Sequence, residues 1–363
     1  MDFLEDLKTI ININSHTENK HGVDKVGKHM SIWLQELGFE TIKYERELLG
    51  DHLLFKTKKR DGIKILLLGH NDTVFPKGYF EGFKEDEEWV YGPGVCDMKG
   101  GNIVALESLR NIYKENNEIY NIDFLLVSDE ETGSDDSKEV TMSIAKDYDY
   151  CFVFEAAGAN LEVVTSRKGV GRYIIKIDGK ASHAGTSYTK GINANLEGAI
   201  KLQKYSELIN LEEGTIVNVG QIEGGIGINT VSPYCEMKME FRFDKKNEQK
   251  RVMDAVEEIT STSYVLGTKA HADGIIQRGV MEENSKQLEL IKFFEELTSE
   301  SIPKERRGGV SDANIVASCG VTTIDGFGPY GDGDHTIKER ALKSSFLQRI
   351  EMMTKILRHY QNI

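Results

Sequence analysis

The sequence predicts an α/β protein whose first domain is interrupted by a smaller inserted α+β domain. Up to residue 155, short apolar runs alternate with helical patterns, which is typical of a layered sheet built from βαβ units. From about residue 168 the order becomes strand, helix, strand, strand, helix, strand, which is the ferredoxin-like order. A length of 363 residues suits two domains. We therefore expect a discontinuous layered domain over residues 1–168 and 281–363, with the insertion at residues 169–280.

Both helices and strands of the first domain can be located from their apolar patterns. Val26, Met30 and Leu34 share one face of the first predicted helix, and Gly38 is expected to end it. The strands are short runs rich in Ile, Leu, Val and Phe that are followed at once by polar residues. The predicted helices cover residues 24–38, 100–114 and 341–360, and the predicted strands cover residues 63–69, 122–128, 148–154 and 321–327.

The inserted domain shows alternating strands and two amphipathic helices. Residues 172–181 alternate between apolar and polar side chains, as a strand with one buried face does. The other predicted strands cover residues 216–223, 234–243 and 273–279, and the predicted helices cover residues 193–208 and 248–261.

Composition narrows the classes of protein that fit the chain. Hydrophobic residues make up 39%, and no apolar run approaches the ~18 residues of a membrane span. The net charge is −14 with scattered basic residues, which disfavours nucleic acid as a partner. The N-terminus is acidic and lacks the pattern of a secretory signal, and the four cysteines are far apart. We therefore expect a soluble cytoplasmic protein with no membrane partner.

Five side chains of the types that bind metals stand at the ends of short apolar runs or in glycine-rich loops. Three of them follow predicted strands of the first domain. In open α/β sheets ligands bind outside the carboxyl ends of the strands, so these side chains are expected to share one site. We interpret the five as the ligands of a metal centre; they are His70, Asp97, Glu131, Glu155 and His335.

The composition of this set suits two divalent ions. An ion of the zinc type accepts histidine nitrogen and carboxylate oxygen, and a carboxylate can bridge two such ions. The five ligands would then comprise one aspartate that bridges both ions, and one histidine and one further carboxylate for each ion. Glu130 directly precedes Glu131 and is a candidate general base. Asp72, two residues after His70, could hold the second nitrogen of that imidazole.

Each motif taken alone has a simpler interpretation. A His-x-Asp pair occurs by chance, an Asp-Glu-Glu triplet is usually a solvated turn, and Asp97 before a helix would normally be an N-cap. Glu155 is harder to explain in this way, because a carboxylate ending an apolar strand is costly if it is buried unpaired. The joint occurrence of all five favours the metal centre. Cys96 is interpreted as a small filler beside it.

The motifs HNDTV, GPGVCDMKGG, SDEETGS, GKASHAG and GDGDHT, with Glu155 between them, resemble the co-catalytic zinc aminoacylase and carboxypeptidase family. The family includes glutamate carboxypeptidase, acetylornithine deacetylase and succinyl-diaminopimelate desuccinylase, and the resemblance covers nearly the whole chain. It implies a zinc-exopeptidase-like layered α/β catalytic domain, with the insertion as a lid and dimerisation domain.

The resemblance also implies a role for each candidate residue of the first domain. By position, His70 and Glu155 would bind one zinc ion, Glu131 and His335 the other, and Asp97 both; Co²⁺ or Mn²⁺ are alternative metals. Glu130 would be the general base and Asp72 the orienting carboxylate. The family further implies a cis peptide bond between Asp97 and Met98.

For the inserted domain, the resemblance implies a homodimer whose active sites are completed by the partner subunit. His183 in GKASHAG would reach the partner's site and stabilise the oxyanion. Asn229 and Arg242 match positions that hold the substrate's carboxylate, and arginine suits a bidentate grip on such a group. Gly308 and Gly309 match the substrate loop.

The resemblance implies hydrolysis of an amide or peptide bond next to an amino acid with a free carboxylate. The similarity is closest to glutamate carboxypeptidase, so the expected substrate is a small peptide. An N-acyl-amino-acid deacylase of the acetylornithine deacetylase type is the alternative within the family. The alternative of another functional class is a non-catalytic binding protein that has the same fold.

Overall fold

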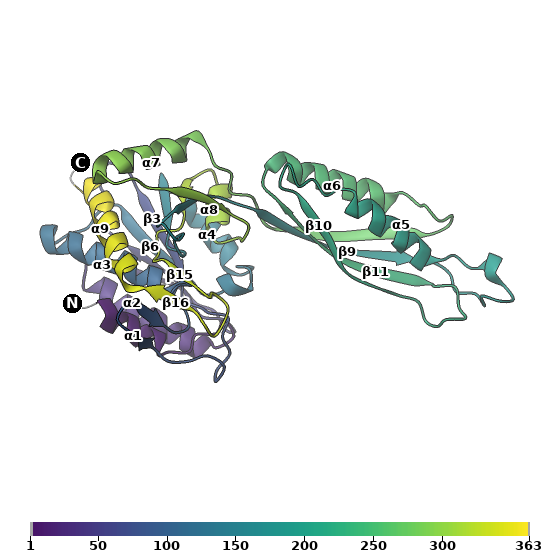
Figure 1. The fold of residues 1–363 in the computed structure, drawn as a ribbon, viewed down its shortest axis with the longest axis horizontal. Coiled ribbons are helices and arrows are strands. Elements are labelled where there is room, and N and C mark those ends of the chain that lie inside the picture. The colour runs from purple at the N-terminus through teal and green to yellow at the C-terminus, as the bar shows by residue number, and fades with distance from the viewer. Residues whose placement is uncertain (1–2, 362–363) are drawn as a thin grey trace. The chain divides into compact units, whose positions relative to one another are not determined.

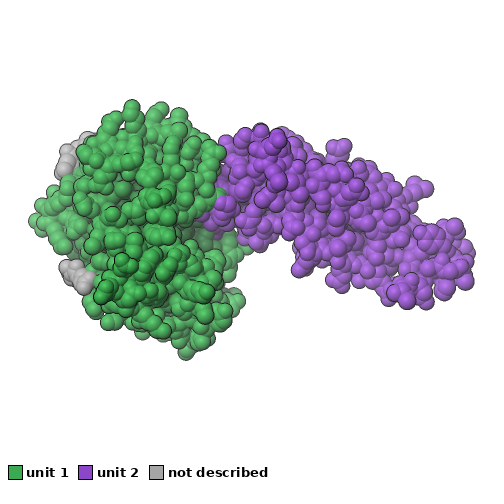
Figure 2. Space-filling view, viewed as in Figure 1, with its two compact units in different colours: residues 1–166, 283–307, 311–363 green, residues 167–282, 308–310 purple. Residues whose placement is uncertain are grey.

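The computed structural model describes residues 3–361, which form two compact units. Unit 1 comprises Met1–Ser166, Glu283–Arg307 and Ser311–Ile363, and unit 2 comprises Arg167–Glu282 and Gly308–Val310 (Figure 2). Unit 2 is therefore inserted into unit 1, and it also includes three residues of a later loop, Gly308–Val310. Within residues 3–361, none of the helices has the length and hydropathy that a bilayer span requires.

Unit 1 is built on a six-stranded sheet with the order β1-β2-β6-β3-β7-β14. Figure 1 labels two of its central strands, β3 and β6. The strand β3 pairs in parallel with β6 and β7, and β14 pairs in parallel with β7, whereas β2 is antiparallel to β1 and β6. All residues of β3 and β6 are buried, as their uninterrupted apolar sequences predict for parallel strands. The strands are β1 (Glu40–Tyr44), β2 (His52–Lys56), β3 (Ile65–His70), β6 (Ile122–Val127), β7 (Tyr150–Val153) and β14 (Thr322–Ile324).

Helices of unit 1 pack around this sheet and share one apolar core. The buried side chains Ile103, Leu106 and Leu109 lie on α3, which packs against α9. The helix α2 begins after Asn19, whose side chain accepts a hydrogen bond from the N–H of Gly22. The helices are α1 (Phe3–Ile11), α2 (Lys20–Gln35), α3 (Lys99–Asn116), α4 (Ser137–Ala145), α7 (Ser285–Thr298), α8 (Ala313–Ser318) and α9 (Lys343–His359).

A smaller four-stranded sheet of unit 1, with the order β15-β16-β5-β4, joins segments that are far apart in the sequence. Its strands are β4 (Lys84–Glu85), β5 (Trp89–Tyr91), β15 (Gly331–Asp332) and β16 (Arg340–Leu342). The pairing of β5 with β16 brings the loop after β5 close to the loop between β15 and β16. A two-stranded pair of β8 (Val163–Arg167) and β13 (Lys304–Arg307) completes the strands outside unit 2.

Unit 2 has one antiparallel sheet with the order β10-β11-β9-β12 and two helices that pack on it. Alternate residues of β11 are buried against α5 and α6, including Met237, Met239 and Phe241. The order of elements and of strands is ferredoxin-like, so the predicted fold class is confirmed. The elements are β9 (Gly169–Asp178), α5 (Ala194–Ser206), β10 (Ile216–Gly224), β11 (Tyr234–Phe243), α6 (Lys246–Ser261) and β12 (Lys269–Arg278).

The loop between β1 and β2 is held by one buried carboxylate, that of Asp51. Its oxygens accept hydrogen bonds from the ammonium of Lys20 and the backbone N–H of Arg46, both at 2.8 Å, and lie 2.8 Å from Lys43. Burial alone would raise the pKa of Asp51, but Lys20, Lys43 and the N–H of Arg46 outweigh it and lower the pKa to about 2.

We expect Asp51→Asn to lower the free energy of unfolding of the metal-free chain by about 1–2 kcal/mol at neutral pH. Because the folded pKa lies below the unfolded value of about 3.9, this stability is complete above pH ~4 and is lost as the pH falls towards 2. Urea unfolding at several pH values measures the difference between wild type and variant. Glu115→Gln, which removes an exposed ion pair with Arg358, is the control and should change little. A pH-independent Asp51→Asn effect contradicts the assignment.

Candidate metal centre

Three candidate ligands lie at the carboxyl ends of neighbouring parallel strands. His70 is the last residue of β3, Glu155 follows the end of β7 by two residues, and Glu131 lies in a 3-10 turn, Glu130–Thr132, after β6. Because β6, β3 and β7 are adjacent and parallel, their ends meet at one edge of the sheet. The strands therefore bring together side chains that are far apart in the sequence.

Asp97 lies in the loop that leads from β5 into α3. The N-cap of α3 is Met98 rather than Asp97, so the simple capping interpretation of Asp97 is wrong. The peptide bond between Asp97 and Met98 is cis. His335 lies in the loop between β15 and β16, which the small sheet holds near the Asp97 loop.

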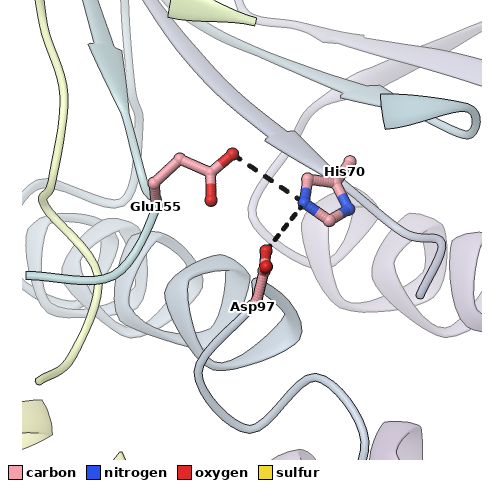
Figure 3. Close-up of side chains that lie close together, drawn as sticks. All are labelled: His70, Asp97 and Glu155. Atoms are coloured by element: carbon pink, nitrogen blue, oxygen red, sulfur yellow. Dashed lines mark hydrogen bonds and ion pairs between the residues drawn. The ribbon is translucent and has the colours of Figure 1, made fainter. Parts of the chain in front are cut away.

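The first group of possible ligands consists of His70, Asp97 and Glu155 (Figure 3). The Nε2 atom of His70 lies 3.2 Å from one oxygen of Asp97 and 3.8 Å from Oε1 of Glu155. One ligating atom from each residue lies within 4.8 Å of the others. His70 and Glu155 are buried, with 1% and 8% exposure.

The second group consists of Asp97, Glu131 and His335. The Nε2 atom of His335 lies 3.1 Å from Oδ2 of Asp97 and 3.2 Å from Oε2 of Glu131. Asp97 thus directs Oδ1 towards His70 and Oδ2 towards His335. This carboxylate is the one member that the two groups share, as a bridging ligand would be.

The charges of the cluster fit divalent cations. Burial and the charge of Asp97 raise the pKa of Glu131 to about 8, although the hydrogen bond with His335 acts in the opposite direction. Burial and Asp97 also raise the pKa of Glu155 well above its usual range. Hydrogen bonds with Asp97 and Glu131 raise the pKa of His335 to about 11. The raised pKa values of the two glutamates and of the histidine have one cause, which is negative charge crowded into a buried space. Bound cations would offset this charge, and histidine nitrogen with carboxylate oxygen suits ions of the zinc type.

Asp72 contacts two of the candidate ligands. Its Oδ1 atom lies 3.3 Å from Nδ1 of His70, and its Oδ2 atom accepts a hydrogen bond from the backbone N–H of Glu131 at 3.2 Å. The hydroxyl of Thr17 donates to the same Oδ2 atom at 2.7 Å. The carbonyl of Asp72 lies 3.1 Å from Nδ1 of His70. The orienting role of Asp72 stays a prediction, and Thr17 is a neighbouring residue that sequence reasoning missed.

Glu130 begins the 3-10 turn that carries Glu131. Its negative charge contributes to the raised pKa values of both Glu131 and Glu155, so its carboxylate lies close enough to influence both groups. Its role as the general base stays a prediction.

A second residue that sequence reasoning missed is Glu339, which directly precedes β16. Its carboxylate is 1% exposed and accepts hydrogen bonds from the backbone of the Asp97 loop. Burial and the charge of Asp97 raise the pKa of Glu339 to about 8, against the effect of these backbone donors. Its sequence surroundings, IKERAL, resemble an ordinary charged surface and gave no signal.

The other candidate residues belong to unit 2. Asn229 lies beside the His183 loop, since its carbonyl accepts a hydrogen bond from the N–H of Ala184 at 2.8 Å. Two backbone N–H groups, of Gly185 and Thr186, donate to Nδ1 of His183 at 3.1 and 3.2 Å. Because Nδ1 is an acceptor, the proton of the neutral ring lies on Nε2. The exposed His183 is therefore arranged as a hydrogen-bond donor.

Arg242 is tied to two neighbours within unit 2. Its Nε donates to Oε1 of Glu240 at 2.8 Å, and its Nη1 donates to the carbonyl of Gly308 at 3.2 Å. The carbonyl of Gly309 accepts a hydrogen bond from Arg167. Arg242 and the glycine loop are thus brought together, and the guanidinium retains further N–H groups beyond these two contacts.

Comparisons with known proteins identify the family of the chain. The model of Peptidase family M20/M25/M40 matches residues 66–359. Carboxypeptidase G2 of Pseudomonas sp. is 27% identical over 358 residues, which cover 95% of this chain and 86% of the relative. Acetylornithine deacetylase of Photorhabdus laumondii is 30% identical over 232 residues, 59% of each chain. The solved structure of a tripeptidase from Staphylococcus aureus has a TM-score of 0.79 at 22% identity, covering 99% of this chain and 97% of its own.

The family model spans most of the chain and includes all five candidate ligands. The structural likeness independently supports the mixed α/β fold with its parallel sheet. The resemblance found in the sequence motifs is therefore confirmed, and the alternative of a non-catalytic binding protein is not needed. The chain belongs to Peptidase family M20/M25/M40 and is an enzyme of the metallopeptidase class.

Proposed function

We propose that this enzyme is a dizinc hydrolase that cleaves an amide or peptide bond next to an amino acid with a free carboxylate. The observation that carries the proposal is Asp97, whose two oxygens face two separate histidine–carboxylate pairs. His70 and Glu155 would hold one ion, Glu131 and His335 the other, and Asp97 both. A cytoplasmic location is part of the proposal, and the free state of all four cysteines supports it.

The chemistry divides between the ions and the chain's own residues. Bound zinc ions polarise a carbonyl and lower the pKa of water. Glu130 would take the proton from the attacking water and deliver it to the leaving nitrogen. Asp72 would keep the imidazole of His70 in one orientation. His183 of the second subunit would donate its Nε2–H to the oxyanion.

Arg242 and Asn229 are proposed to bind the substrate's free carboxylate. Arg242 suits this role because Glu240 and Gly308 fix its guanidinium while leaving other N–H groups available.

Among the relatives are a carboxypeptidase and a deacetylase, so the bond that is cut has two candidates. We favour a carboxypeptidase of the glutamate carboxypeptidase type, because the similarity to carboxypeptidase G2 extends over 95% of the chain. A deacylase that releases an acyl group from an amino acid is the second candidate.

We further propose that unit 2 forms a homodimer. Among residues 3–361, most of the large exposed apolar side chains belong to unit 2. Ile216 and Ile222 lie on the edge strand β10, with 41% and 49% exposure, and Leu266 is 94% exposed. An edge strand with exposed aliphatic side chains is unfavourable in a monomer, and pairing with a second copy would cover it.

The proposed function makes three predictions, and the first is that the chain binds about two zinc ions and loses its turnover when a chelator removes them. Free-acid dipeptides and N-acyl amino acids are the substrates to test, each paired with its C-terminal amide as a matched control. Only the free acids should be hydrolysed, because Arg242 requires a carboxylate. Metal analysis and amino acid release measure both points, and the series that turns over separates carboxypeptidase from deacylase. A folded chain that binds no metal contradicts the proposal.

The second prediction concerns Glu130. Glu130→Gln should keep both zinc ions and lower kcat by about 10²–10⁴-fold, because an amide cannot take the proton from water. Metal content and steady-state kinetics on the substrate found above provide the measurement. Asp135→Asn, an exposed carboxylate on the same loop, is the control and should leave both values unchanged. Near-normal turnover of the Glu130 variant would remove Glu130 from the mechanism.

The third prediction tests the role of His183 across the dimer. Glu130→Gln and His183→Ala should each be inactive as homodimers, because every site lacks one group. When the two variants are mixed and refolded together, one site of each mixed dimer has both groups, so about a quarter of wild-type activity should return. Refolding each variant alone is the control. If mixing restores no activity although mixed dimers form, His183 does not act across the dimer.

A further inference from the structure

The carboxylate of Glu339 is the common acceptor for three backbone N–H groups of the Asp97 loop. Oε2 accepts from Gly94 at 3.0 Å, and Oε1 accepts from Cys96 at 3.0 Å and from Asp97 itself at 3.1 Å. Glu339 and Cys96 are almost completely buried, so water has little access to these donors. Without the carboxylate, two buried donors and the partly buried N–H of Asp97 would lose their partner, which native structures avoid.

The same residue is anchored to the turn that carries His335. The N–H of Glu339 donates to the carbonyl of Thr336 at 3.1 Å, and its own carbonyl accepts from the N–H of Gly92 at 3.4 Å. His335 lies four residues before Glu339 in this turn. Glu339 therefore connects the loop of the shared ligand, Asp97, to the turn of a second ligand through both its side chain and its backbone.

We propose that Glu339 is a positioning residue that sets the zinc affinity of the centre by fixing the backbone of Asp97. This inference rests on the proposed dizinc function. Because Asp97 faces both groups, a shift of its loop disturbs both ions, whereas loss of Glu155 removes a ligand from one group only. Supporting residues of this kind typically change metal affinity by about 10–100-fold when they are replaced.

Glu339→Gln is the informative variant, because glutamine keeps the size but offers a single acceptor oxygen. Its NH₂ group would face a backbone donor of the Asp97 loop. Glu197→Gln is the matched control: Glu197 is also fully buried and accepts backbone hydrogen bonds, from Tyr264 and Val265. Those partners belong to unit 2, so this variant should lose stability and keep the zinc affinity.

The experiment titrates zinc into the metal-free full-length chains in competition with a chromophoric chelator, well below their unfolding temperatures. We expect Glu339→Gln to bind both zinc ions about 10–100-fold more weakly than wild type. Glu197→Gln should bind zinc as wild type does, and Glu155→Gln should lose one ion. The thermal unfolding of each metal-free chain, measured in parallel, reports the loss of stability separately.

Unchanged zinc affinity in a folded Glu339→Gln chain, with only its stability lowered, would show a purely structural role and overturn the inference. If that variant does not fold, Glu339→Asp is measured in its place. A zinc affinity below that of wild type supports the inference, and an unchanged zinc affinity refutes it. A wild-type chain that binds no zinc is a different result, because it removes the proposed function itself.

Discussion

The parallel pairing of β3 with β6 and β7 is the constraint on which the centre depends. Leu67 of β3 lies opposite Phe124 on one side and Phe152 on the other, and all three are completely buried. A register shift of one residue would move these side chains to the opposite face of the sheet and disrupt their packing, so the apolar packing fixes the alignment of the strands. The same alignment determines where His70 and Glu155 emerge. The energy that positions these two polar residues is therefore supplied largely by the apolar core beneath them.

Asp97 and His335 are positioned by a different kind of interaction. Their loops are held by the pairing of the small sheet and by the buried carboxylate of Glu339, so that hydrogen bonds act together with the packing of Val95 and Met98 in the core. Buried hydrogen bonds are directional and are costly to break, so they can fix the backbone of a loop more closely than packing alone does. The centre thus combines a rigid sheet edge with loops that hydrogen bonds hold in place.

This difference explains what the sequence could reveal. An apolar run that ends in a histidine or carboxylate is visible in the sequence, so His70, Glu131 and Glu155 could be placed at strand ends together with the fold class. The ferredoxin-like order of unit 2 could likewise be predicted, because its strands alternate between apolar and polar residues. Glu339 carried no such signal, because its partner Cys96 is 243 residues away and its own neighbours look like solvated surface. Short elements such as α8, with six residues, are too brief to show a period.

The proposed substrate groups in unit 2 are ordered by local hydrogen bonds although they are exposed. The His183 loop is bridged to Thr230, two backbone N–H groups fix the ring, and Glu240 and Gly308 hold Arg242. Ordering a long side chain upon binding costs free energy, so groups that are already fixed give a substrate more net affinity. This arrangement favours recognition of a small, charged end of the substrate by preformed donors. It also accounts for the presence of Glu240 beside Arg242: a carboxylate there costs some attraction for an anion but keeps the guanidinium in one place.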